Sequence, residues 1–108
     1  AFPTLDDPFG IVVLEAAASG LPIVASPFGG ATLDLVEDGR SGFVVSPDEP
    51  DAWARALVTL ASDPALCRRL GERGHATTLD RTPERAAAGY EQAVRAALRP
   101  PGGVRRRR

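Results

Sequence analysis

The feature that most constrains the fold is the alternation of short apolar runs with helix-like segments in residues 1–46. The runs "LPIVAS" (21–26) and "GFVVS" (42–46) are almost continuously apolar, as expected for strands covered on both faces of a sheet. The opening "AFPTL" (1–5) predicts the end of a third buried strand. Strands that alternate with helices at this spacing indicate an α/β fold, in which right-handed crossovers join a parallel sheet.

Glycines and prolines predict the limits of the helices between these strands. Pro8 fits the first turn of a helix that runs to about Ser19, and Gly20 fits its C-terminal cap. The segment "ATLDLVEDG" (31–39) predicts a short helix that Gly39 ends.

The second half of the chain is predicted to be helical. Its helices are expected within residues 47–63, 64–79 and 82–99. Thr82 is the expected N-cap of the last helix, and Pro83 occupies its first position. In the first of the three, one apolar face is formed by residues that recur at helical spacing: Trp53, Leu57, Leu60 and Ala61.

Three strands are few for a doubly wound domain, which usually contains about five or six. We therefore expect residues 1–99 to form the second half of such a Rossmann-like domain, with the other half upstream. The chain contains no Met and does not begin with one, which also favours a partial chain. Residues 100–108 are expected to form a disordered basic tail.

The charge balance indicates that the folded part is acidic. All 13 basic residues are Arg, and four of them form the terminal "RRRR". Without these four, nine basic residues stand against 14 acidic ones, which argues against a nucleic-acid-binding face. The tail itself fits either a plain solvated terminus or a contact with anionic lipid or RNA.

Nothing in the sequence predicts a membrane span or secretion. No apolar run reaches the ~18 to 20 residues that a span needs, and no cationic segment followed by an apolar one opens the chain. The single cysteine, Cys67, cannot form an internal disulfide, which fits a reducing compartment. We therefore expect a cytoplasmic protein.

The start of the first helix predicts a seat for a phosphate group. Its first-turn amides, those of Phe9, Gly10 and Ile11, lack intrahelical acceptors, and the helix dipole favours negative charge there. Gly10 carries no side chain that would keep an anion from the backbone. Helix starts with a glycine are common, so this pattern alone is not specific for phosphate.

Glu15 is the single charge in this otherwise apolar helix, and no Arg lies three or four residues away to pair with it. Two interpretations stay open on spacing alone. Glu15 occupies the exposed stripe of a buried helix, or its carboxylate lies at the C-terminal edge of the sheet, where open parallel sheets bind ligands. There it would accept hydrogen bonds from adjacent hydroxyls of a ribose, and Asp7 would reach a second hydroxylated group beyond the phosphates.

Three linked stretches form a recognisable pattern: "DDPFGIVVLEAAASGLPIVAS" (6–26), "GGATLDLVEDGRSGFVV" (29–45) and "PDEPDAWARALVTLASDPALCRRLGERG" (47–74). Through these stretches the chain resembles the C-terminal domain of retaining glycosyltransferases, family 4 and relatives, of the GT-B fold. The resemblance spans residues 3–98, about nine-tenths of the chain. The family pattern is an acidic residue, seven further residues and a Glu, with Phe-Gly between them and Ala-x-Ala-x-Gly-x-Pro following. The positions that match it are Asp7, Phe9, Gly10, Glu15, Ala16, Ala18, Gly20 and Pro22.

The resemblance implies a nucleotide diphosphate sugar as donor, and transfer of its sugar to an acceptor hydroxyl with retained anomeric configuration. Glu15 would bind the ribose of the donor, and the amides at Gly10 and Ile11 would lie near its diphosphate and sugar. Asp7 would lie near the sugar hydroxyls as the candidate catalytic residue. Many members of the family need no bound metal, since backbone dipoles and basic side chains stabilise the departing diphosphate; no cofactor is expected.

Further positions of the family pattern complete the candidate donor site. Phe9 belongs to the Phe-Gly pair beside the phosphates, and Gly29 and Gly30 match a glycine pair close to the donor. Two positions depart from the pattern. The first acidic residue is usually Glu, one methylene longer than Asp7, and Asp34 replaces a Pro-Glu step in a segment that is one residue longer here.

The family's basic residues that clamp the diphosphate, and its acceptor domain, would lie upstream of Ala1. We therefore expect this chain to bind the donor but to be inactive alone, with an upstream N-terminal domain as its partner. The basic tail would offer the parent enzyme a peripheral membrane contact. Two alternatives stay open: a fragment of a GT-B epimerase or phosphorylase, and a non-catalytic α/β module that binds a partner through a sheet edge or its tail.

Three other residues are predicted to be structural. His75, the only histidine, lies in the polar stretch "ERGHATT" and is expected at the surface. Cys67 is expected to pack on its helix, and Trp53 is expected in the core.

The last helix is expected to be a packing element. Because the C-terminal helices of GT-B enzymes cross back toward the N-terminal domain, part of its apolar face would lack a partner here: Tyr90, Val94 and Leu98.

Overall fold

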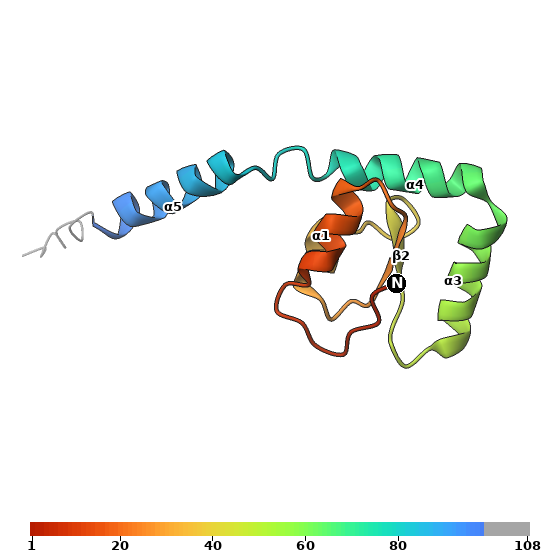
Figure 1. Cartoon of the computed structure of the whole chain (residues 1–108). Helices are drawn as coiled ribbons and strands as arrows, with labels where there is room; N and C mark the ends of the chain where they lie inside the picture. The colour runs from red at the N-terminus through yellow and green to blue at the C-terminus, as the bar shows by residue number, and fades with distance from the viewer. Residues whose placement is uncertain (99–108) are drawn as a thin grey trace, which may run out of the picture.

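The computed structural model describes residues 1–98, which form an α/β fold with a short parallel sheet and helices on both of its faces (Figure 1). Its elements are α1 (Ile11–Ala18), β1 (Ile23–Ala25), α2 (Gly30–Leu35), β2 (Gly42–Val44), α3 (Pro50–Ser62), α4 (Pro64–Ala76) and α5 (Pro83–Ala97). This order confirms the predicted alternation of strands and helices and the helical second half. The predicted basic tail, residues 100–108, lies outside the described residues.

The sheet is parallel, as the continuous apolar runs predicted. β1 pairs with β2 in parallel, with Val24 opposite Phe43. On the other side of β1, Phe2 forms a single parallel bridge with Ala25. Two hydrogen bonds hold this bridge, from Phe2 N–H to the Val24 carbonyl (2.8 Å) and from Ser26 N–H to the Phe2 carbonyl (2.9 Å). The third predicted strand is therefore present as the bridge at Phe2.

Different helices cover the two faces of the sheet, which explains why β1 is apolar at every position. Because side chains alternate along a strand, Ile23 and Ala25 face α1 and α2, whereas Val24 faces α3. The buried cluster on the first face contains Val13, Ala17, Ile23, Ala25, Ala31, Leu35 and Val36. The cluster on the second face contains Val24, Val45, Trp53 and Ala56.

The first helix begins later than predicted, at Ile11 instead of near Pro8. Gly10 is its N-cap and has φ +79°, a left-handed conformation that glycine adopts without strain. The chain therefore turns sharply just before the helix, and Pro8 remains in the preceding loop. No side chain caps this helix start.

The C-terminal end of α1 is closed by the glycine that the sequence predicted. Gly20 has φ +68°, and its N–H donates to the Ala17 carbonyl at 2.9 Å. The next N–H, that of Leu21, donates to the Ala16 carbonyl at 3.0 Å. These two bonds form a Schellman motif, which satisfies helix carbonyls that would otherwise lack donors.

The second helix is shorter than predicted and ends at Leu35 instead of Gly39. Val36 leaves it in an extended conformation and is buried against the first face of the sheet. Burial of this side chain therefore ends the helix before the glycine is reached. Gly39, with φ +71°, lies in the following turn, where the Arg40 guanidinium donates to the Glu37 carboxylate at 3.0 Å.

The third helix turns a narrower face to the sheet than predicted. Trp53 is buried, as expected, and its indole N–H donates to a carbonyl of the β2–α3 connection at 2.8 Å. Ala56 is also buried and Leu60 half-buried, but Leu57 is 45% exposed. The prediction that Leu57 and Ala61 belong to the buried face is wrong. The two short strands contact only a narrow strip of α3, which is formed by residues at positions i, i+3 and i+7.

The last helix, α5, extends away from the rest of the molecule (Figure 1). Thr82 is its N-cap, as predicted, and accepts a hydrogen bond from Arg85 N–H. None of its residues is buried, and its large apolar side chains are exposed: Tyr90, Val94 and Leu98. Within residues 1–98, no helix is long and apolar enough to cross a membrane.

Candidate functional site

Two loops lie side by side at the C-terminal edge of the sheet, one after the bridge at Phe2 and one after β1. Three backbone hydrogen bonds join them: Asp7 N–H to the Phe28 carbonyl (3.1 Å), Gly30 N–H to the Asp7 carbonyl (3.2 Å), and Ala31 N–H to the Phe9 carbonyl (2.6 Å). Asp7 also forms a parallel bridge with Gly29. The structure thus brings the loop before α1 together with the glycine pair.

The glycines of these loops make room for Phe2, whose ring lies beneath them. A Cβ atom at Gly10 would lie 2.8 Å from the ring of Phe2, and one at Gly29 would lie equally close. On the sequence alone, the glycine at position 10 was explained by the access to the backbone that an anion would need. Its left-handed φ and its contact with Phe2 are two further reasons for a glycine at this position.

The amides without an acceptor at the start of α1 lie one residue further along than predicted, at Gly10, which is buried, and at the exposed Ile11 and Val12. The N–H of Phe9 is occupied, because it donates to the Asp7 carboxylate (Oδ1) at 3.0 Å. Val13 N–H donates to the Gly10 carbonyl at 3.0 Å. Across residues 1–98, the N–H groups of Gly10, Ile11 and Val12 have no acceptor. The sequence missed Val12 because it placed the helix start too early.

Asp7 is half-buried in the loop before α1. Its Oδ1 atom stabilises the turn by accepting the bond from Phe9, whereas Oδ2 has no hydrogen-bond partner in the described part of the chain. One oxygen therefore fixes the orientation of the carboxylate, and the other remains available to a ligand.

Glu15 lies one turn beyond Ile11 on an exposed face of α1. Its carboxylate forms no ion pair or side-chain hydrogen bond with any of residues 1–98. Glu15 would be exposed in either of its two predicted roles, as part of a solvated stripe or as a contact to a ribose.

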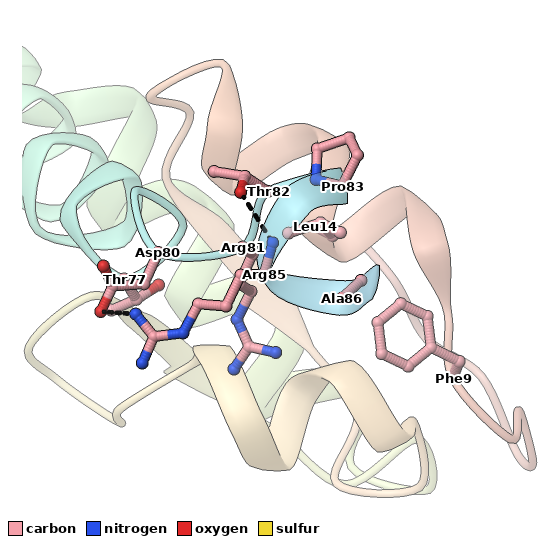
Figure 2. Close-up of a pocket in the computed structure, with 9 residues that line it drawn as sticks. All are labelled: Phe9, Leu14, Thr77, Asp80, Arg81, Thr82, Pro83, Arg85 and Ala86. Carbon is pink, nitrogen blue, oxygen red and sulfur yellow. Dashed lines mark hydrogen bonds and ion pairs between the residues drawn. The ribbon is translucent and has the colours of Figure 1, made fainter. Parts of the chain in front are cut away.

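A hollow of about 710 Å³ adjoins this site between α1 and the start of α5. Figure 2 shows side chains from α1 and its preceding loop meeting those of the α4–α5 connection around it. The Arg85 guanidinium is paired with Asp80 at 3.0 Å. The residues that line the hollow are Phe9, Leu14, Thr77, Asp80, Arg81, Thr82, Pro83, Arg85 and Ala86. Sequence reasoning missed the arginines because they lie about 70 residues after Phe9 and only folding brings them near it.

Two carboxyl groups outside these loops have lowered pKa values. The Ser46 hydroxyl donates to Asp48 and, together with the Asp48 N–H, lowers the pKa of that carboxyl. The pKa of Glu84 is lowered by its own N–H at the start of α5 and by the Thr82 hydroxyl. Among the described residues, no group of three His, Cys, Asp or Glu side chains is placed to hold a metal ion.

Residues 1–77 match the family described as Glycosyl transferases group 1. The chain belongs to this family. It is 45% identical over 69 residues to the D-inositol 3-phosphate glycosyltransferase of Streptomyces avermitilis, covering 64% of this chain and 15% of that protein. The enzyme of the same name from Mycolicibacterium gilvum is 39% identical over 97 residues, which cover 87% of this chain and 22% of that protein.

Solved structures of glycosyltransferases share the fold of this group 1 chain. Sucrose-phosphate synthase from Thermosynechococcus elongatus superposes with a TM-score of 0.79 at 32% identity, covering 89% of this chain and 24% of that one. HepE from Anabaena, solved in complex with UDP-glucose, superposes with a TM-score of 0.72 at 29% identity, covering 86% and 25%. The predicted family and GT-B fold class are confirmed. The chain spans between 15% and 25% of these relatives.

Proposed function

We propose that this chain is the donor-binding portion of a retaining glycosyltransferase, which transfers a sugar from a nucleotide diphosphate sugar to an acceptor hydroxyl. The observation that carries the proposal is the open start of α1, where the amides of Gly10, Ile11 and Val12 have no acceptor within residues 1–98. A helix start with free N–H groups attracts a diphosphate through hydrogen bonds and through the helix dipole. The presence of UDP-glucose in the HepE complex supports a donor of this class.

Glu15 is placed to bind the ribose of such a donor. It lies four residues after Ile11, which is about 6 Å along the helix axis. A ribose joined directly to the diphosphate would lie at this distance from the amides. The Glu15 carboxylate, which has no partner among residues 1–98, can accept hydrogen bonds from two adjacent hydroxyls.

Asp7 is proposed to contact the sugar on the other side of the diphosphate. Its free Oδ2 atom accepts hydrogen bonds from sugar hydroxyls, while Oδ1 stays bonded to Phe9 N–H. Gly29 and Gly30 lie beside it and are proposed to contact the donor through their backbone, while the absence of their side chains makes room for Phe2 and for the Pro8 backbone. Asp7 and these backbone groups hold the sugar in place while the amides of α1 stabilise the charge that develops on the departing diphosphate.

The proposal assigns donor binding, and not the whole reaction, to these 108 residues. The chain corresponds to less than a quarter of the D-inositol 3-phosphate glycosyltransferases that it matches. The acceptor site and the basic residues that would complete the diphosphate site are assigned to other parts of the parent enzyme. We therefore expect no detectable sugar transfer by the chain alone.

Calorimetric titration with UDP, GDP and ADP tests the donor site and identifies the preferred base. Replacing Glu15 by Ala should weaken nucleotide binding about tenfold or more, because the ribose loses its charge-assisted hydrogen bonds. The same variant should bind pyrophosphate as well as the parent chain does, because the amides of α1 are unchanged. Asp51→Ala, which removes an exposed carboxylate from α3 on the opposite face of the sheet, is the matched control.

Two results would contradict the proposal. Equal nucleotide affinities of the parent and Glu15→Ala chains would remove Glu15 from the site. Failure of every nucleotide and of pyrophosphate to bind, even when the upstream half of the domain is restored, would favour a non-catalytic module instead.

A further inference from the structure

The C-terminal end of α1 is held by a side chain from α4. His75 Nδ1 lies 2.9 Å from the carbonyl oxygen of Ala18, the last residue of α1. The two residues are 57 positions apart in the sequence. A carbonyl can only accept, so the ring donates from Nδ1. The sequence correctly placed His75 at the surface, but nothing in its pattern indicated this contact.

The backbone of α4 packs against the same end of α1. A Cβ atom at Gly71 would overlap the carbonyl oxygen of Gly20, so at this point the two backbones approach as closely as atoms allow. Next to it, the side chain of Leu70 is 1% exposed. Contacts between backbones cannot adapt by rotamer changes, so they fix the position of the turn after α1 relative to α4.

The short length of α1 couples its two ends. The helix has eight residues, about 12 Å, and lies as one rigid rod on the sheet. A tilt at the C-terminal end therefore changes the direction of the N–H groups at the other end. Those groups, of Gly10, Ile11 and Val12, are the proposed diphosphate contacts.

We propose that His75 is a positioning residue for the donor site. From α4 it holds the last carbonyl of α1 and thereby sets the direction of the open amides at the first turn. This inference rests on the proposed function for its consequence in donor binding. Its structural content, the coupling of His75 to the amides of Gly10, Ile11 and Val12, does not depend on any ligand.

The surroundings of His75 provide a matched control. A hollow of about 360 Å³ lies beside this contact between α4 and the end of α1, and two charged side chains of α4, Arg68 and Glu72, line it with His75. Glu72 lies on the same helix, one turn before His75, and makes no hydrogen bond to α1 within residues 1–98. Removing Glu72 changes the charge of the hollow but leaves the contact with Ala18 intact.

Amide NMR spectra of the ligand-free chain test the coupling directly. In His75→Ala, the amide signals of Gly10, Ile11 and Val12 should shift clearly more than in Glu72→Ala. His75→Asn should move them back toward the parent positions, because the Asn amide nitrogen takes the place of Nδ1. His75→Gln, whose amide reaches the place of the outer ring nitrogen, should not restore them. Shifts confined to α4 and to the end of α1 would overturn the inference.

Titration with pyrophosphate connects the coupling to binding. We expect the affinity to fall about threefold in His75→Ala and to recover in His75→Asn, with Glu72→Ala equal to the parent chain. If the parent chain binds pyrophosphate and the amide signals do not move in His75→Ala, the positioning role is wrong and the donor site stands. If the signals move but pyrophosphate does not bind even when the upstream half of the domain is restored, the positioning role stands and the donor site is wrong.

Discussion

The helix α1 has almost none of the sequence features that stabilise an isolated helix, whereas α5 has nearly all of them. α1 has no side-chain cap, no acidic residue in its first turn and no basic residue in its last turn. α5 has the N-cap Thr82, with Glu84 in its first turn and Arg95 in its last. Yet α1 buries Val13 and Ala17 against the sheet, and α5 buries nothing among the described residues.

This difference shows what leaves the N–H groups of a helix start without acceptors. In α5 the N-cap occupies a backbone N–H group that would otherwise lack an acceptor, since the Thr82 hydroxyl accepts the Arg85 N–H at 3.2 Å. A side-chain cap of this kind contributes about 1 kcal/mol to a helix. α1 lacks a cap and is stabilised by packing and by contacts at its C-terminal end, so its first amides stay open. The helix that looks weaker in the sequence is the one whose start is proposed to bind an anion.

The largest effect on stability is expected at a glycine of the packed helix α4, and a glycine of α5 provides the comparison. Gly71→Ala should lower the free energy of unfolding by about 3 kcal/mol, because its Cβ would overlap the backbone of Gly20. Gly89→Ala should leave it unchanged and raise the helicity of α5, since its Cβ would meet open space. Urea unfolding followed by the fluorescence of the buried Trp53 measures the first effect, and circular dichroism the second.

A loss of stability in Gly89→Ala would show that α5 packs on the body in solution. Equal unfolding midpoints of Gly71→Ala and the parent chain would show that α4 does not approach α1 as closely as described.

A smaller effect separates the two ends of α1. Gly10 and Gly20 both have positive φ, but only Gly10 has the ring of Phe2 where a Cβ would lie. Gly20→Ala should cost about 1 kcal/mol through its left-handed conformation alone, and Gly10→Ala about 2 kcal/mol through conformation and contact together. Urea unfolding of the two variants measures the difference. If Phe2→Ala does not reduce the cost at Gly10, the ring contact is not its cause.

The sequence predicted the elements of the fold well where local and tertiary signals agree. The parallel strands, the Schellman end of α1 at Gly20 and the N-cap of α5 at Thr82 each follow from residues close in sequence. It failed where tertiary packing decides. Burial of Val36 ends α2 early, and the narrow sheet leaves Leu57 exposed.

The candidate site shows the same limit. Spacing predicted free amides at Phe9, Gly10 and Ile11, but Phe9 N–H donates to Asp7, so the amides without an acceptor begin one residue later. The sharp turn at Gly10, which delays the helix start, is also not revealed by any periodicity. The contact between His75 and Ala18 joins residues 57 positions apart, so only the folded chain could show it.

The smallest expected effect is the acid sensitivity of α5. Its helix start holds the Glu84 pKa below the ordinary value of 4.5, through the Glu84 N–H and then through the Thr82 hydroxyl. The helix start stabilises the charged form of the Glu84 carboxylate. Its contribution to the stability of α5 is therefore complete above the ordinary pKa and is lost as the pH falls through the lowered pKa. The helical signal of α5 should therefore decrease only below about pH 4.5, and Glu84→Gln should remove this part of the decrease. Thr82→Ala should move it to higher pH. Circular dichroism of the three chains between neutral pH and pH 2 measures these changes. If the parent chain and Glu84→Gln lose the same helical signal over the acidic range, α5 gains no stability from the charge at its start.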